Sequence, residues 1–101
     1  MKIDFSGVLK GLRGDPLKDQ DGNDLTLRTI AANAILGPAL PGEKLTGQIQ
    51  LLRFQLAHQI FSAIEPLDIK AENVVLIKNQ ISANYPTIIA GQAWEIIEKS
   101  E

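Results

Sequence analysis

The stretch from Thr46 to Ile64 constrains the fold of this chain more than any other segment. At 100° per residue its apolar side chains gather on one side of a helix, opposite several glutamines. Glu65-Pro66 ends the helix, because a residue before proline disfavours helical dihedrals. An amphipathic helix of this length needs other elements to cover its apolar side, so we predict a domain of packed helices. The side chains predicted to be buried are Ile49, Leu52, Leu56, Ala57, Ile60, Phe61, Ala63 and Ile64.

Three shorter segments also repeat apolar residues at helical spacing. The first starts after the N-cap Thr26 and stops at Gly37-Pro38. The second spans Ala71 to Ala83, and the third follows Pro86. The first segment is rich in alanine, which lets a neighbouring backbone come close, so we expect it to be a central packing element. The residues expected to be nearly inaccessible are Leu56, Ile60, Ile77, Ile81, Ala93 and Ile97.

The first 25 residues differ from the rest, because they are rich in Gly and Asp and contain short β-like pieces. Asp21-Gly22 predicts a hairpin, since both residue types tolerate the positive φ of a tight turn. A three-residue loop, the preferred register, places Leu17 opposite Leu27 and separates apolar from polar faces. A two-residue loop places Leu17 opposite Thr26 instead.

Together these patterns predict an α+β fold that is mainly helical, with an N-terminal β-hairpin packed on a bundle of about four helices. With 101 residues the chain is expected to form a single domain over 1–101, with a β-hairpin region at 1–25 and a helical region at 26–101. The segment 66–69 fits either a short edge strand or an extended link.

Composition argues against several classes of function. The formal net charge is −2 and the ten Lys and Arg residues are scattered, so the chain lacks a basic field and nucleic acid is not an expected partner. The absence of cysteine removes disulfides, thiolate metal sites and a cysteine nucleophile. No run approaches the ~18 apolar residues of a membrane span, and no signal-peptide pattern opens the chain. We therefore expect a cytoplasmic protein with no membrane partner.

The acidic run between Asp15 and Asp24 is the one segment that suggests a metal. Several carboxylates in a short loop are the oxygen ligands that calcium prefers. A calcium loop counted from Gly22 would, however, begin at Leu17 and end at Arg28, and neither is a ligand. The spacing therefore favours a solvated turn.

The remaining titratable residues do not assemble a catalytic pattern. His58 is the only histidine, and no serine or carboxylate near it in sequence has the spacing of a triad or dyad. Glu95, Glu98 and Glu101 fit a solvated face near the C-terminus. We expect no catalytic residue, no metal and no cofactor, and so a protein that is not an enzyme.

Four residues are candidates for a protein interface: Leu51, Arg53, Phe54 and Ile88. Arg53 falls inside the apolar stripe of its helix, so its guanidinium must reach past the core edge, pair with a carboxylate or face a partner. Leu51 and Ile88 lie outside the apolar stripes of their helices, which is common for single aliphatic side chains. They form an interface if the fold brings them together with Arg53 or Phe54, and otherwise the hairpin or the 37–44 loop covers them.

The order of features resembles a set of small, mostly uncharacterised proteins of tailed bacteriophages and prophages. The segments that carry the resemblance cover most of the chain: Met1-Lys2-Ile3-Asp4-Phe5, Asp21-Gly22-Asn23 with Leu25-Thr26-Leu27, Ala31-Ala32-Asn33-Ala34-Ile35-Leu36, Glu65-Pro66, and Tyr85-Pro86 through Gly91-Gln92-Ala93-Trp94-Glu95-Ile96. The chain departs from such proteins at the starts of its second and third helices, which are less acidic. The resemblance implies a phage context and transfers no site residue.

The expected function is that of a non-catalytic phage accessory protein that acts by protein–protein contact, of the assembly-factor or chaperone type. Its partner would be a phage structural protein or a host protein, and a homo-oligomer is possible. Two alternatives stay open at this point. One is a phage inhibitor of a host protein or defence system, and the other is a binder of nucleotides or other small ligands.

The spacing of the acidic run leads to a first prediction, that the chain folds without metal. Thermal melts followed by circular dichroism should coincide in calcium and in a chelator. A rise of several degrees in calcium would show that the acidic run binds the ion.

Overall fold

The computed structural model describes residues 1–100, which form four helices and one two-stranded sheet. The elements in chain order are β1 (Lys2–Ile3), α1 (Leu27–Ile35), α2 (Gly47–Ser62), β2 (Leu67–Asp68), α3 (Ala71–Asn84) and α4 (Thr87–Lys99). The expected fold class, a mainly helical α+β domain, is confirmed. None of these helices combines the length and the apolar character needed to cross a membrane.

Local sequence signals set where α1 and α2 begin. Thr26 and Thr46 are extended N-caps, and the side-chain oxygen of each accepts a hydrogen bond from the backbone N–H three residues later, at 3.4 and 3.2 Å. Each cap satisfies a donor that the first helical turn leaves without a partner. The predicted N-cap Thr26 is therefore confirmed.

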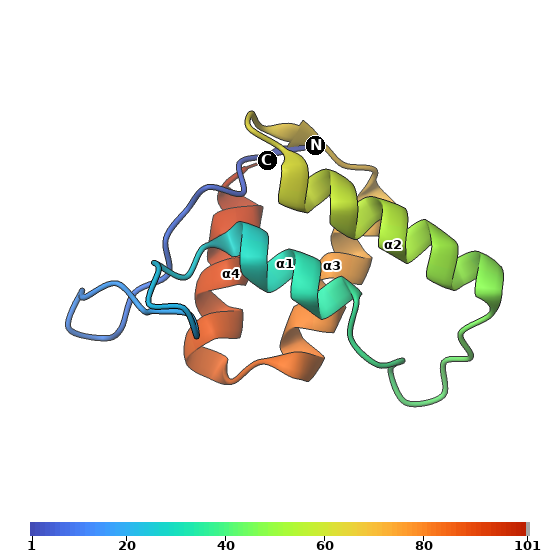
Figure 1. The fold of residues 1–101 in the computed structure, drawn as a ribbon, viewed down its shortest axis with the longest axis horizontal. Helices are drawn as coiled ribbons and strands as arrows, with labels where there is room; N and C mark the ends of the chain where they lie inside the picture. The colour runs from blue at the N-terminus through green and yellow to red at the C-terminus, as the bar shows by residue number, and fades with distance from the viewer. Residues whose placement is uncertain (101) are drawn as a thin grey trace.

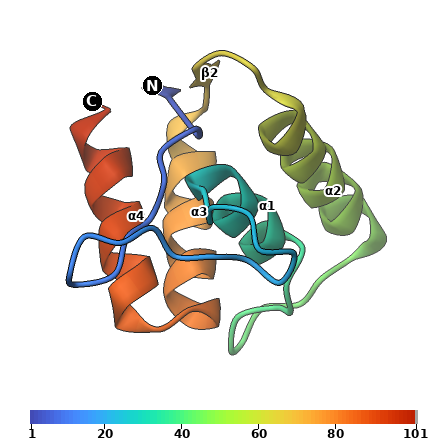
Figure 2. The same ribbon diagram turned by 60° about the vertical axis from the view of Figure 1, so that its left-hand side comes forward.

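Proline separates α3 from α4. Tyr85 leaves the helical region with ψ of 151°, as expected for a residue that precedes proline, and Pro86 is the N-cap of α4. The two helices therefore follow each other with almost no loop, and Figure 2 shows them side by side.

Helix α1 is the central element, as its alanines predict. It packs against α2 on one side and α3 on the other, and α4 packs against α3. Figures 1 and 2 accordingly place α2 and α4 at opposite ends of the row. Ala31, Ala32 and Ala34 are buried, so the neighbouring helices approach the α1 backbone closely.

The N-terminal region crosses the start of α1 and joins two distant parts of the chain. β1 pairs antiparallel with β2, with Ile3 opposite Leu67, so the 66–69 segment is an edge strand and not a plain link. The N-terminal amino group forms an ion pair with Asp68 at 3.0 Å. The arm contributes three buried side chains that close the core: Ile3, Phe5 and Leu9.

The predicted register of the acidic turn is wrong. Lys18 bridges Asp24, and the Leu25 N–H donates to the Leu17 carbonyl, so Leu17 lies opposite Leu25 and not Leu27. The reason is local, because Asp19 Oδ1 accepts hydrogen bonds from the backbone N–H groups of Asp21 and Asn23. The Asp19 N–H also donates to the Asn23 carbonyl at 2.8 Å, so the three-residue loop is 20–22, one residue earlier than predicted, with Gly22 at a φ of 83°.

The six residues expected to be nearly inaccessible are all buried. The predicted stripe of α2, in contrast, is only partly correct. Arg53, Leu56, Ala57 and Ile60 are buried, but Leu52, Phe61 and Ile64 are exposed. A hollow of about 500 Å³ separates α2 from the start of α3, so Leu52 has no helix over it. α2 is therefore covered along one narrow side only.

Two leucines four residues apart on α2 test this arrangement. Leu56 is 8% exposed and Leu52 is 59% exposed. Leu56→Ala should lower the free energy of unfolding by about 2–5 kcal/mol, because it opens a cavity between α2 and α1. Leu52→Ala should change it by less than about 0.5 kcal/mol. Equal losses in denaturant titrations would contradict the one-sided packing of α2.

Candidate functional site

The exposed side of α2 is the strongest candidate for a functional site. Leu51, Phe54 and Phe61 are 55%, 59% and 63% exposed, and the exposed His58 lies between the two phenylalanines along the helix. At 100° per residue these four side chains fall within an arc of about 80°. We call them the outer seam. The inner seam, Arg53, Leu56, Ala57 and Ile60, lies about 130° round the helix and faces α1.

The surface of α2 carries no Asp, Glu, Lys or Arg side chain. Every exposed residue of the helix is Gly, Gln, Leu, Phe, Ser or His, although 22% of the whole chain is charged. The one charged residue between Gly47 and Ser62 is Arg53, and it is turned inward. Solvated helix faces normally carry charged side chains, whereas the centres of protein interfaces are depleted in charge and enriched in aromatic residues.

An ion pair with Glu43 explains how Arg53 can lie in the apolar stripe. The Arg53 Nη2 group donates to Glu43 Oε2, and the Leu40 N–H donates to the other carboxylate oxygen at 3.1 Å. The guanidinium first, and the Leu40 N–H second, hold the pKa of Glu43 below its ordinary value of 4.5. Of the three possibilities for Arg53, pairing with a carboxylate is thus the one observed, and the pair fastens the 37–46 loop to α2.

A shallow hollow of about 340 Å³ adjoins the outer seam where α1 ends and α2 begins. Phe54 and Arg53 line it together with residues of the loop. The other lining residues are Ile35, Leu36, Gly37, Pro38, Leu45 and Gln50. Leu36 is itself exposed, so the apolar surface extends from α2 onto the end of α1.

The four predicted interface residues do not form one surface. Three of them belong to α2: Leu51, Arg53 and Phe54. Leu51 and Phe54 are exposed, whereas Arg53 is buried on the side of the helix that faces α1. Ile88 lies on the first turn of α4, 40% exposed, beside the Gln92 side chain that bonds to the Lys10 backbone. Figures 1 and 2 show α4 and α2 at opposite ends of the molecule, so Ile88 is separate from the other three.

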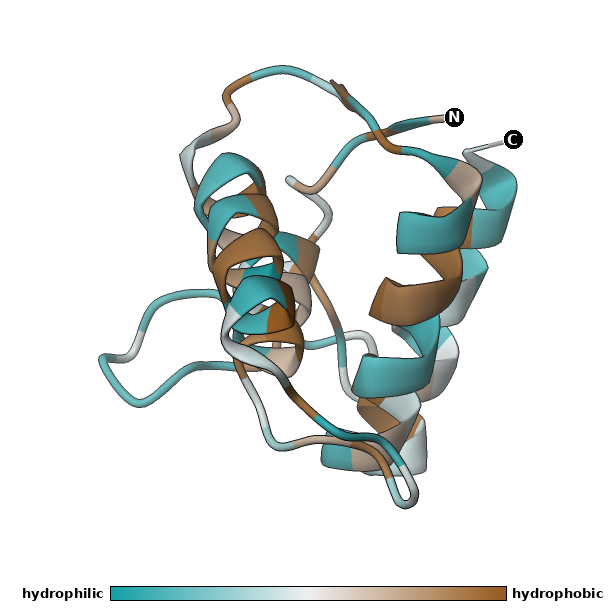
Figure 3. Ribbon diagram, turned by 90° about the vertical axis from the view of Figure 1, so that its right-hand side faces the viewer, coloured by the Kyte–Doolittle hydropathy of each residue, from teal (hydrophilic) through white to brown (hydrophobic). Residues whose placement is uncertain are grey.

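Sequence reasoning missed Phe61 and Leu36, because it assigned Phe61 to the buried stripe and gave Leu36 no role. A signal was present in the sequence: between Gly47 and Ser62 only one residue in sixteen is charged. Figure 3 shows brown, hydrophobic segments recurring along α2 between its polar ones. A helix with apolar residues on two sides has more apolar surface than one neighbour can cover.

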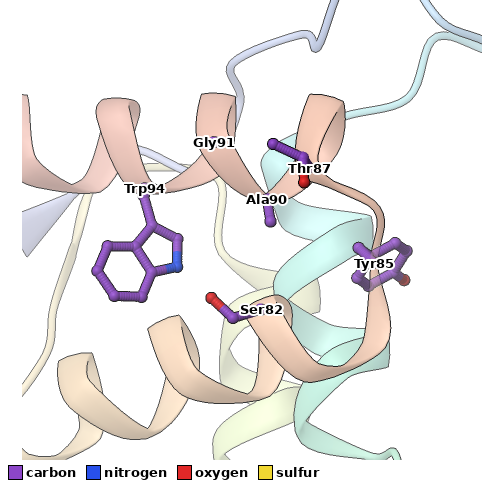
Figure 4. A pocket seen from close by; sticks show the side chains of 6 residues that line it. All are labelled: Ser82, Tyr85, Thr87, Ala90, Gly91 and Trp94. Atoms are coloured by element: carbon purple, nitrogen blue, oxygen red, sulfur yellow. The ribbon is translucent and has the colours of Figure 1, made fainter.

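A second concave site lies between the end of α3 and the start of α4 (Figure 4). Its volume is about 420 Å³, and Tyr85 and Trp94 lie at its two ends. The Trp94 Nε1 group already donates to the Lys78 carbonyl at 3.0 Å, and the Lys78 ammonium lies over the indole ring. Burial raises the pKa of the Tyr85 phenol, so it stays protonated at neutral pH. The arrangement offers no charged group aimed at a ligand.

The other polar candidates are not assembled into a reactive group. His58 stacks on Phe54, with ring centroids 6.4 Å apart, and no carboxylate bonds to it in the described part of the chain. Asp19 and Asp24 are occupied by turn hydrogen bonds and by Lys18. Within residues 1–100 no three His, Cys, Asp or Glu side chains lie close enough together to hold a metal ion.

Comparisons with known proteins add no relative: no family model matches the chain, and neither the curated proteins nor the solved structures include a match.

The Arg53–Glu43 pair predicts how stability depends on pH. Because the pKa of Glu43 is lowered in the folded state, its contribution is complete above the ordinary value of 4.5 and is lost as the pH falls through the lower, folded value. Glu43→Gln should therefore lower the melting temperature at pH 7, and the difference in melting temperature from the parent should shrink as the pH falls below 4.5.

Glu65→Gln is the matched control, since Glu65 is exposed and forms no ion pair among the described residues. Glu65→Gln should leave the melting temperature unchanged at pH 7 and at pH 3. A gap between parent and Glu43→Gln that stays constant down to pH 3 would mean that the carboxylate charge does not stabilise the fold.

Proposed function

We propose that this chain acts by protein–protein contact and that the outer seam of α2 is the contact surface. The observation that supports the proposal most directly is a solvent-facing helix whose one charge is turned inward. Leu36, Leu51, Phe54 and Phe61 are each more than half exposed, so together they form an apolar patch on the order of the largest one on a typical monomer, about 300–600 Å².

The chemistry of the surface limits the kind of partner that it fits. A charged partner surface would lose hydration against the outer seam without gaining an opposite charge, which is unfavourable. An apolar, uncharged protein surface, such as the exposed side of another amphipathic helix, loses nothing comparable and buries two phenylalanines. The partner we propose is therefore a protein with an uncharged apolar face.

The biological setting that we propose is that of a phage accessory protein, of the assembly-factor or chaperone type. This setting rests on the sequence resemblance alone, and the geometry of α2 suits a phage protein and a host protein equally, provided that its partner surface is uncharged and apolar. A host-directed inhibitor would use the same contact surface, so the identity of the partner distinguishes the two roles.

Photocrosslinking in the cells that naturally produce the chain tests this function. A benzophenone amino acid at Phe54 should form covalent adducts, whereas the same group at Leu12, which is 96% exposed on the N-terminal turn, should form few or none. Mass spectrometry of the Phe54 adduct then identifies the partner. A phage structural protein would indicate an assembly factor, and a host protein would indicate an inhibitor.

Equal yields at Phe54 and Leu12, or no adduct at either position, would contradict the outer seam as the contact surface. The same benzophenone amino acid at Gln59, which lies on α2 but outside the outer seam, is a second control. It shows whether adducts form at any exposed position of α2.

A further inference from the structure

From the spacing of the outer seam we infer that its occupant is a second copy of this chain, bound through an antiparallel α2–α2 contact. The inference rests on the proposed function, because it names the partner for the same surface. It is carried by three features of α2: the intervals between its exposed side chains, the uncharged residues beside them, and the hollow at its start.

The intervals between the four outer-seam residues are three, four and three. This is the a/d spacing with which two helices pack lengthwise. It also reads the same in both directions, about a midpoint at the level of residue 56. A two-fold axis at that level would place Leu51 beside Phe61 of the second copy and Phe54 beside its His58.

Each layer of this contact would pair two different outer-seam side chains, either Leu51 with Phe61 or Phe54 with His58. Phe54 and His58 already stack within one chain, so the two-fold contact would join two such stacks around the axis. An arrangement of this kind is isologous, because the same patch supplies both halves of the interface. Four residues at alternating intervals of three and four always read the same in both directions, so the outer seam can meet its own copy in an antiparallel pair.

The residues beside the seam remove the usual obstacle to self-association. In an antiparallel pair each flank meets the same flank of the other copy, so a charged residue there would face like charge. One flank of α2 consists of Gln48, Gln55 and Ser62, all exposed and uncharged. Their side chains both donate and accept hydrogen bonds, so they can pair with their own copies.

The hollow at the start of α2 also fits a second copy. In the antiparallel register Ile64, which is 94% exposed just after the helix, falls at the level of Gln48 to Gln50 of the other chain. The hollow lined by Gln50 and Phe54 lies at that end of α2. An exposed aliphatic side chain at one end of the helix and an apolar hollow at the other end would then meet twice in one dimer.

The size of the contact predicts its strength. Two copies of a patch of about 300–600 Å² bury on the order of 1,000 Å², at the lower limit for a specific interface. The dimer should therefore dissociate in the micromolar range. Sedimentation of the parent from about 1 to about 300 µM should show a mass that rises from one chain toward two.

Substitutions on the two sides of the molecule test which surface is used. Phe54→Asp should keep the helical circular-dichroism signal and weaken dimerisation at least tenfold, because it puts a carboxylate in the middle of the contact. Leu12→Asp, at another exposed leucine far from α2 in sequence, should not change the dissociation constant. A parent that sediments as one chain throughout, or a Phe54→Asp variant that dimerises as well as the parent, overturns the inference.

Cysteine cross-linking tests the antiparallel register without disturbing the seam, and the chain has no native cysteine to interfere. At 1.5 Å per residue, the two Gln55→Cys positions would differ by about 3 Å along the axis, and the two Gln48→Cys positions by about 24 Å. A short bis-maleimide should therefore join Gln55→Cys chains and not Gln48→Cys chains. Joining at both positions would indicate a parallel pair, and joining at neither position would contradict an α2–α2 contact.

These outcomes separate the inference from the function on which it rests. If the chain stays monomeric but the benzophenone at Phe54 captures a different protein and the one at Leu12 does not, the second copy is wrong and the contact surface stands. If the chain stays monomeric and the benzophenone at Phe54 captures no protein, both the second copy and the outer seam as contact surface are wrong.

Discussion

The packing of α2 against α1 alone is the constraint on which the rest of the structure depends. α1 has nine residues and is shared between two helices, so it can cover only one narrow side of the sixteen-residue α2. Leu56, Ala57 and Ile60 fill that side. The other apolar residues of α2 are too numerous for this single neighbour, and they remain at the surface. The contact surface is thus a consequence of how the helices are connected.

The Arg53–Glu43 pair shows how one charged residue serves this arrangement. A guanidinium inside an apolar stripe is costly unless a carboxylate pairs with it. Glu43 provides the carboxylate from the loop that joins α1 to α2, and the same loop forms part of the hollow beside Phe54. Because Arg53 is turned inward, the exposed side of α2 has no Asp, Glu, Lys or Arg side chain that would repel the same side of a second copy.

Much of the fold could be predicted from the sequence, because its signals are local. The Thr26 cap, the proline at 86 and the alanines of α1 each act through neighbouring residues, and their predicted effects are confirmed. The predicted register of the acidic turn is wrong, since Gly22, with a φ of 83°, ends the three-residue loop and places it one residue earlier than predicted. Gln80 is fully buried and donates to the Ala34 carbonyl, a contact that depends on where α3 lies.

The candidate site could be predicted only in part. Leu51 and Phe54 were identified as interface residues, but Phe61 was assigned to the core and Ile88 was grouped with residues that lie far from it. Helical periodicity gives the angle of each side chain round its own axis and does not give the number of neighbours that the helix will have. That number depends on the lengths and connections of all four helices, so which side of α2 is covered emerges only in three dimensions.

The most direct test of the account is the melting temperature of the unaltered chain as a function of its concentration. If the outer seam is covered by a second copy in the folded state, mass action stabilises the folded chain as concentration rises, and the melting temperature should climb steadily from micromolar to millimolar chain. A melting temperature that is the same over this whole range would show that the exposed face of α2 pairs with no second copy, and would contradict the central claim.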